Sequence, residues 1–241
     1  MKHFLSVILL LFLFPLFAAA EEDALQTRAE RAYRASDWAS AQALYGVVCS
    51  RQPDNFRAAA RAITAGLMRG DTASVEPLVE QTLSAVVPLD SLMNAFESEA
   101  RGLGRADVYV ATLHRLVDSL PYMRRPFNAR LLNYYCFRQD ADRIIEYSQL
   151  LLSGLPDTSR YLNPLAWGYA LKGDMEQAIA TWLRSINADP DNFEALVAAG
   201  NALAETNPEQ ALAFLLRAND INPSPYLNQT IHRLLSSNSH D

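Results

Sequence analysis

Apolar residues recur every three or four positions along most of the chain, which is the spacing of an amphipathic helix. The clearest example lies between residues 160 and 172, where the apolar face consists of Leu162, Leu165, Ala166 and Tyr169. Gly173 follows this segment, and glycine accepts the left-handed backbone that ends many helices. The pattern therefore predicts a helix that ends just before Gly173.

A second amphipathic segment follows the turn. Its apolar face runs through Ala178, Trp182 and Ser185, and it ends at Pro190, because proline cannot continue the interior of a helix. Ala178 is small, as expected where two helices cross closely. Residues 160–190 are therefore predicted to form two packed helices joined by a tight turn.

Two further features repeat with one period. Six prolines recur at nearly equal intervals, and they are Pro53, Pro88, Pro121, Pro156, Pro190 and Pro223. Six turn-like pairs recur at the same interval, and they begin at Ser36, Gly70, Gly104, Gln139, Gly173 and Thr206. Two independent series with one period indicate six structural repeats over residues 22–224.

The segment from Leu162 to Pro190 resembles a tetratricopeptide repeat, a helix-turn-helix unit of about 34 residues. Similar patterns occur at residues 41–53 and 196–223. The units at 56–88, 89–121 and 125–156 resemble the repeat in period and turns only, and the small alanine is replaced there by Val75, Tyr109 and Ile144. The resemblance implies an all-α fold: an α-solenoid, wound as a right-handed superhelix, of about six helix-turn-helix repeats covering residues 21–224.

Residues 225–241 follow the last repeat. The stretch from Tyr226 to Leu235 is amphipathic, which predicts a capping helix over the apolar face of the last repeat. The residues after it are polar, and we expect them to fray.

The N-terminal segment, residues 1–20, has the layout of a secretory signal peptide. A charged start at Lys2 precedes an apolar run over residues 4–17 and three alanines that end at Ala20. The run is shorter than the roughly 20 residues of a membrane span. We expect cleavage after Ala20 and export to the bacterial periplasm without stable membrane insertion, and an uncleaved anchor is the alternative.

Composition narrows the classes of function. The net charge of -6, which becomes -7 once Lys2 is removed, is unfavourable for nucleic acid, because phosphate neutralisation needs clustered cations. Two cysteines rule out a disulfide-rich scaffold and a four-thiolate zinc site. Cys49 and Cys136 lie three repeats apart, so we expect both to be reduced. Without a phosphate loop, nucleophile elbow or HExxH motif, we expect no enzyme, cofactor or metal.

The first helices of a helical-pair solenoid line its concave side. Opposite the apolar face of the clearest first helix lie Arg160, Asn163 and Trp167, spaced i, i+3 and i+7. Similar positions on neighbouring first helices complete the candidate binding groove, which consists of Arg130, Asn133, Arg160, Asn163, Trp167 and Asn201. Two alternatives stay open: Trp167 packs between neighbouring first helices, or the polar positions are simply solvated.

These features predict a non-enzymatic protein-protein interaction scaffold or adaptor of the cell envelope, which binds a peptide or partner helix in the groove. The alternative is an assembly or chaperone-like factor for outer-membrane or secretion machinery, and an RNA-binding solenoid or an enzyme is less favoured. Some tetratricopeptide proteins grip a terminal carboxylate with lysines, but Lys172 is the only lysine after the predicted signal. We therefore do not expect this chain to share the specificity of those proteins for a terminal carboxylate. The sequence leaves the oligomeric state open.

Overall fold

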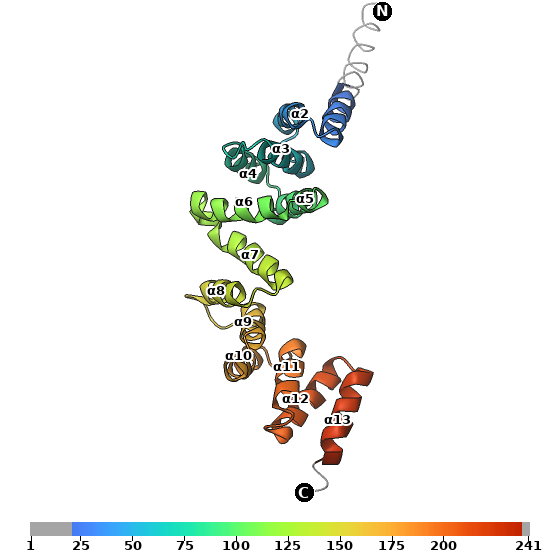
Figure 1. Cartoon of the computed structure of the whole chain (residues 1–241), viewed down its shortest axis with the longest axis vertical. Helices are drawn as coiled ribbons and strands as arrows, with labels where there is room; N and C mark the ends of the chain where they lie inside the picture. The colour runs from blue at the N-terminus through green and yellow to red at the C-terminus, as the bar shows by residue number, and fades with distance from the viewer. Residues whose placement is uncertain (1–20, 238–241) are drawn as a thin grey trace, which may run out of the picture. The chain divides into compact units, whose positions relative to one another are not determined.

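The computed structural model describes residues 21–237, which are almost entirely helical and contain no strand (Figure 1). The all-α prediction is therefore confirmed as a helical-repeat fold. The predicted signal peptide and the last residues of the polar tail, 238–241, lie outside this range. Within it, no helix combines the length and the apolar character needed to cross a bilayer.

The chain divides into two compact units, with the boundary between Pro121 and Tyr122. The first unit holds three helical hairpins, formed by residues 21–34, α2 (Trp38–Arg51), α3 (Phe56–Met68), α4 (Val75–Ser84), α5 (Leu89–Gly102) and α6 (Ala106–Ser119). The short 3-10 helix η1 (Pro121–Met123) follows. In this unit α3 packs against both α2 and α5, so the first helices of successive hairpins contact each other.

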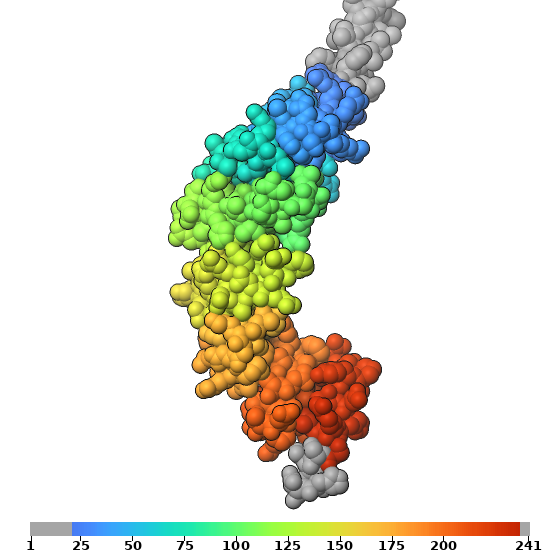
Figure 2. Space-filling model, viewed as in Figure 1, coloured from blue at the N-terminus to red at the C-terminus, as the bar shows by residue number. Residues whose placement is uncertain are grey.

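The second unit also holds three hairpins, and a single helix follows them. Its helices are α7 (Arg124–Arg138), α8 (Ala141–Leu152), α9 (Ser159–Leu171), α10 (Met175–Ala188), α11 (Phe193–Leu203), α12 (Pro208–Ile221) and α13 (Pro225–Ser237). Each of these helices packs against the next one. Figure 2 shows the surfaces of successive hairpins adjoining one another within each unit.

The predicted turn pairs join the two helices of each hairpin. The first residue of five pairs has a left-handed backbone, with φ of 56° at Ser36, 80° at Gly70, 70° at Gly104, 54° at Gln139 and 81° at Gly173. In each of these turns the next N–H bonds the carbonyl oxygen five positions back, at distances of 2.8–3.1 Å. This is the Schellman arrangement, which satisfies carbonyl groups at the end of a helix.

The sixth pair differs from this pattern. Thr206 is not left-handed, and the N–H of Asn207 bonds the carbonyl of Leu203, four positions back, at 2.8 Å. Asn207 still begins the next helix, because its side chain accepts the N–H of Gln210 at 3.2 Å. Asp37, Asp140 and Asp174 cap α2, α8 and α10 in the same way, so one dipeptide both ends a helix and begins its partner.

One departure from the repeat pattern, Ile144 in place of the small alanine, is explained by packing. Ile144 is fully buried on α8, and the residue that it meets on α9 is Gly168. A Cβ atom on Gly168 would lie 3.0 Å from Cγ2 of Ile144 and 2.9 Å from Cγ1 of Ile145. The volume added on one helix is therefore matched by volume removed on the other.

The predicted capping helix is α13. Its apolar face buries Leu227, Ile231 and Leu234 in the same core as Leu215 of α12. Gly200 of α11 also faces Leu215, and a Cβ atom there would lie 2.7 Å from its Cγ atom. The last hairpin is therefore closely packed both internally and against its cap.

A cluster around Arg61 connects the first helices of the first unit. Arg61 of α3 forms an ion pair with Glu30 and donates to Glu99 of α5, with an Nε–Oε1 distance of 2.9 Å. The Tyr45 hydroxyl donates to Glu30 at 3.0 Å and accepts from Arg61 at 3.1 Å. The guanidinium also lies over the rings of Tyr33 and Tyr45. The cluster therefore joins four helices through one cation.

We predict opposite effects of alanine at two helical glycines. Gly200→Ala should lower the free energy of unfolding by about 1–3 kcal/mol, because the added methyl group collides with Leu215. Gly46→Ala in α2 should raise it by about 0.5–1 kcal/mol, because nothing lies within 4 Å of the new Cβ atom. Urea unfolding followed by circular dichroism measures both, and equal midpoints for the two variants would contradict the packing described here.

The Glu30 carboxylate should make the first unit sensitive to acid. Burial raises the pKa of Glu30, but the hydrogen bond from Tyr45 and the charges of Arg61 and Arg34 outweigh it, so the pKa lies below its usual value of 4.5. A lowered folded-state pKa stabilises the protein above pH 4.5, and this contribution is lost as the pH falls through the lowered pKa. Glu30→Gln should cost about 1–3 kcal/mol at neutral pH.

The difference in unfolding free energy between wild type and Glu30→Gln should then shrink as the pH is lowered from neutral through 4.5 and into the range of the lowered pKa. The matched control is Glu21→Gln on the same helix, which removes an exposed ion pair and should change stability little at any pH. A constant difference between wild type and Glu30→Gln across this range would exclude the assigned role of Glu30.

Candidate functional site

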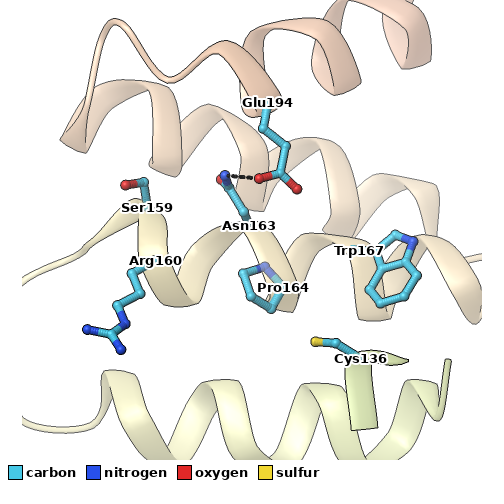
Figure 3. Close-up of a pocket in the computed structure, with 7 residues that line it drawn as sticks. All are labelled: Cys136, Ser159, Arg160, Asn163, Pro164, Trp167 and Glu194. Atoms are coloured by element: carbon cyan, nitrogen blue, oxygen red, sulfur yellow. Dashed lines mark hydrogen bonds between the residues drawn. The ribbon is translucent and has the colours of Figure 1, made fainter. Parts of the chain in front are cut away.

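A hollow of about 490 Å³ lies on the second unit, and we call it the α9 hollow (Figure 3). Seven residues from three first helices line it: Cys136 of α7; Ser159, Arg160, Asn163, Pro164 and Trp167 of α9; and Glu194 of α11. Arg160, Pro164 and Trp167 lie on the side of α9 opposite the buried Leu162 and Ala166, and Asn163 lies at the edge of the buried side. Helical spacing thus separates the face that packs from the face that lines the hollow.

Asn163 is buried and is held by its neighbours. Its amide forms a reciprocal pair with the amide of Asn192, with N–O distances of 3.2 and 2.9 Å. The Ser185 hydroxyl donates to the Asn163 oxygen at 2.7 Å and accepts from Asn192 at 2.8 Å. This network connects α9, α10 and the start of α11, where Asn192 is the N-cap.

The network also positions the carboxylate of Glu194. The second amide hydrogen of Asn163 goes to Oε2 of Glu194, with an N–O distance of 2.9 Å. Figure 3 shows this carboxylate extending from α11 toward α9, between Asn163 and Trp167. Within residues 21–237, no cationic side chain lies within salt-bridge distance of Glu194. Its charge is therefore fixed in place by a neutral amide and is not neutralised.

Arg160 lies at the opposite end of the α9 hollow from Trp167 (Figure 3). The side chain is exposed, and its guanidinium lies 5.6 Å from the centre of the Tyr161 ring. Among the described residues, no carboxylate forms an ion pair with it. The hollow thus carries one cation and one anion that are both without an ionic partner.

Trp167 and Cys136 form the remaining wall. Trp167 is half-buried, so one part of its ring packs on the protein and another part stays accessible. Burial raises the pKa of the Cys136 thiol to about 11, and the negative charge of Glu194 adds to this increase. The thiol is therefore neutral at physiological pH, and it presents a small apolar surface beside the indole.

The structure brings three of the six predicted site residues together: Arg160, Asn163 and Trp167. Arg130 and Asn133 lie on α7 but do not line the hollow, and Asn201 on α11 accepts the hydroxyl of Tyr226 at 3.1 Å. Asn163 does line the hollow, but both of its amide hydrogens and its oxygen are already bonded within the protein.

The site residues predicted from the sequence did not include Glu194, Asn192 or Ser185. A signal for Glu194 was present, because it follows Arg160 by one repeat period and has the opposite charge. The described part of the chain contains no grouping of three His, Cys, Asp or Glu side chains that could hold a metal ion. The chemistry that the hollow offers is therefore recognition through charge and an aromatic surface.

No protein-family model and no curated protein matches this chain. Solved structures show similarity at low identity. The C-terminal part of a TPR repeat-containing protein from Cytophaga hutchinsonii is 11% identical, with 80% of this chain and 77% of that chain covered and a TM-score of 0.48. The hairpins described above have the helix-turn-helix arrangement that the sequence resemblance implies.

Two further solved structures show the same level of similarity. A TPR repeats protein from Bacteroides fragilis is 12% identical, with 90% of this chain and 98% of that chain covered and a TM-score of 0.42. The TPR2AB domain of yeast Sti1, solved as a pHSP90 complex, is 14% identical, with 90% of this chain and 99% of that chain covered and a TM-score of 0.39.

We predict that Glu194→Gln lowers the pKa of Cys136, because one of the two causes that raise it is the Glu194 charge. More thiolate at a given pH means faster alkylation, so the rate with iodoacetamide should rise at about pH 9. Mass spectrometry of each cysteine peptide measures this rate. Cys49 is the internal control, because burial alone raises its pKa to about 11. An unchanged rate at Cys136 would place Glu194 away from the thiol.

Proposed function

We propose that this protein is a non-catalytic scaffold that binds a peptide segment of a protein partner in the α9 hollow. The observation that carries this proposal is the presence of Arg160, Glu194 and Trp167, two unpaired charges and an accessible aromatic ring, around one open hollow. Arginine and tryptophan are enriched among residues that dominate binding energies at protein interfaces.

The construction of the hollow also supports a binding role. Its lining residues come from packed helices, so a ligand meets side chains that are already positioned. A site on rigid elements loses little conformational entropy when it binds. Pro164 leaves one backbone acceptor of α9 free for a ligand. Proline has no N–H, so the carbonyl oxygen of Arg160 does not receive the hydrogen bond it would usually have within the helix.

We place this scaffold in the bacterial cell envelope, on the basis of the signal-like pattern in residues 1–20. An assembly or chaperone-like factor for outer-membrane or secretion machinery is the alternative within the same class. N-terminal sequencing of the protein from its host tests the proposed export. A mature chain that begins at Glu21 supports it, and a retained Met1 excludes cleavage.

Trp167→Ala should weaken capture of the partner at least tenfold, because tryptophan anchors at interfaces often contribute about 2 kcal/mol or more. The measurement is in-cell crosslinking from a photoreactive residue at Ser159, followed by titration of the captured partner's peptide onto the purified protein. Leu150→Ala on the exposed face of α8 is the matched control and should bind as wild type does. Equal affinity of the Trp167→Ala variant for that peptide would exclude the α9 hollow as the binding site.

A further inference from the structure

The α9 hollow carries two opposite charges that no ion pair within residues 21–237 neutralises. Four cations of the second unit form ion pairs with carboxylates, and these pairs are Arg143–Glu146, Lys172–Asp142, Arg184–Asp157 and Arg217–Asp191. Arg160 and Glu194 have no such partner in the described part of the chain, although both line one hollow. Two opposite charges are therefore available to a ligand at the same site.

Glu194 is fixed in place. Both amide hydrogens of Asn163 are used, one by Asn192 and one by Glu194, so movement of the carboxylate would leave a buried N–H without an acceptor. Leaving a buried donor unsatisfied is unfavourable, because the group has lost its hydrogen bonds to water. Only Oε2 of Glu194 is used in this way, and the second carboxylate oxygen is left for a ligand. The anion is thus preorganised and still has capacity to accept hydrogen bonds.

Trp167 lies beside this carboxylate in the hollow (Figure 3). The face of an indole ring attracts cations, and a carboxylate forms short hydrogen bonds with ammonium and guanidinium groups. Cys136 completes this end of the hollow and contributes no charge, because its thiol stays protonated. The Trp167–Glu194 end is therefore suited to a basic side chain.

The Arg160 end is suited to the opposite charge. Its guanidinium presents parallel N–H donors that match a carboxylate. Arg160 and Trp167 are separated by two turns of α9, which corresponds to about 10 Å along the helix axis. An extended peptide covers this distance with about three residues.

We propose, on the basis of the peptide-binding function above, that the α9 hollow recognises an extended segment with two charged side chains. A lysine or arginine of the partner docks between Trp167 and Glu194, and an aspartate or glutamate two or four positions away, on the same side of the extended segment, docks on Arg160. The order of the two charges fixes the direction in which the segment lies along α9.

Other occupants fit the charges less well. An apolar segment would cover Glu194 and Arg160 without compensating either charge, which carries a desolvation cost. A segment of acidic side chains, or the phosphates of a nucleic acid, would be repelled by Glu194. A segment with only basic side chains would be repelled by Arg160.

The test is selection of a displayed library of random dodecapeptides on the purified full chain. Wild type should enrich peptides with a basic and an acidic residue two or four positions apart, the spacings that place both side chains on one side of an extended segment. Glu194→Gln should reduce the enrichment of basic residues about fivefold, the factor expected for one charge contact of about 1 kcal/mol. The Asn163 bond is kept in this variant, because the glutamine oxygen can accept it.

The sharpest variant exchanges the two charges, Arg160→Glu with Glu194→Arg. It should select peptides in which the order of the basic and acidic residues is reversed. The matched control is Glu209→Gln, which changes a glutamate at the same position in the first turn of α12 and should select the wild-type pattern. Circular dichroism of each variant verifies that the helices are intact.

The possible outcomes separate the two levels of the proposal. The charge-pair recognition would be overturned if the enriched peptides require Trp167 but carry no paired charges. It would also be overturned if their binding is unaffected by Glu194→Gln. Either result would leave peptide binding in place. The peptide-binding function itself would be overturned if no enriched peptide loses its binding in the Trp167→Ala variant. The charge-pair recognition would be overturned with it.

Discussion

A helical hairpin of this chain has an apolar face on each side, and the hairpin alone cannot bury both of them. Stacking hairpins at close range solves this problem, and close range requires small residues where the helices cross. Gly168 is such a residue between two hairpins and Gly200 is one within a hairpin, since a methyl group on either would lie within 3.0 Å of a neighbouring side chain. At the end of the array α13 covers the remaining face with Leu227 and Ile231. Because stacking uses the other faces of the first helices, one face of each is left for polar residues.

The features that could be predicted from the sequence are those set by local chemistry. Gly173 and Asp174 determine a turn through their own backbone preference and capping ability, so the period of such pairs predicted the hairpins. The match between Ile144 and Gly168 could not be predicted, because it depends on a contact between two helices. The departure at Thr206 has the same origin, since Asn207 can begin α12 without a left-handed residue before it.

The same distinction applies to the candidate site. Arg160, Asn163 and Trp167 share one helix, so their spacing alone placed them on one face. Glu194 comes from another helix, and its position depends on the amide pair between Asn163 and Asn192. Asn201 is bonded by Tyr226 of the capping helix, which is outside the repeat and which no repeat period can anticipate. Sequence spacing thus identified the helix that carries the site but not the contacts that complete it.

The two units connect their first helices by different chemistry. In the first unit Arg61 is neutralised by Glu30 and Glu99, and Arg34 balances the second charge, so that cluster uses its own ions. In the second unit a neutral amide pair performs the same connecting role. A neutral connection holds the Glu194 carboxylate in place without neutralising its charge. The choice of amides over ions inside the second unit is therefore what leaves the Glu194 carboxylate available to a partner.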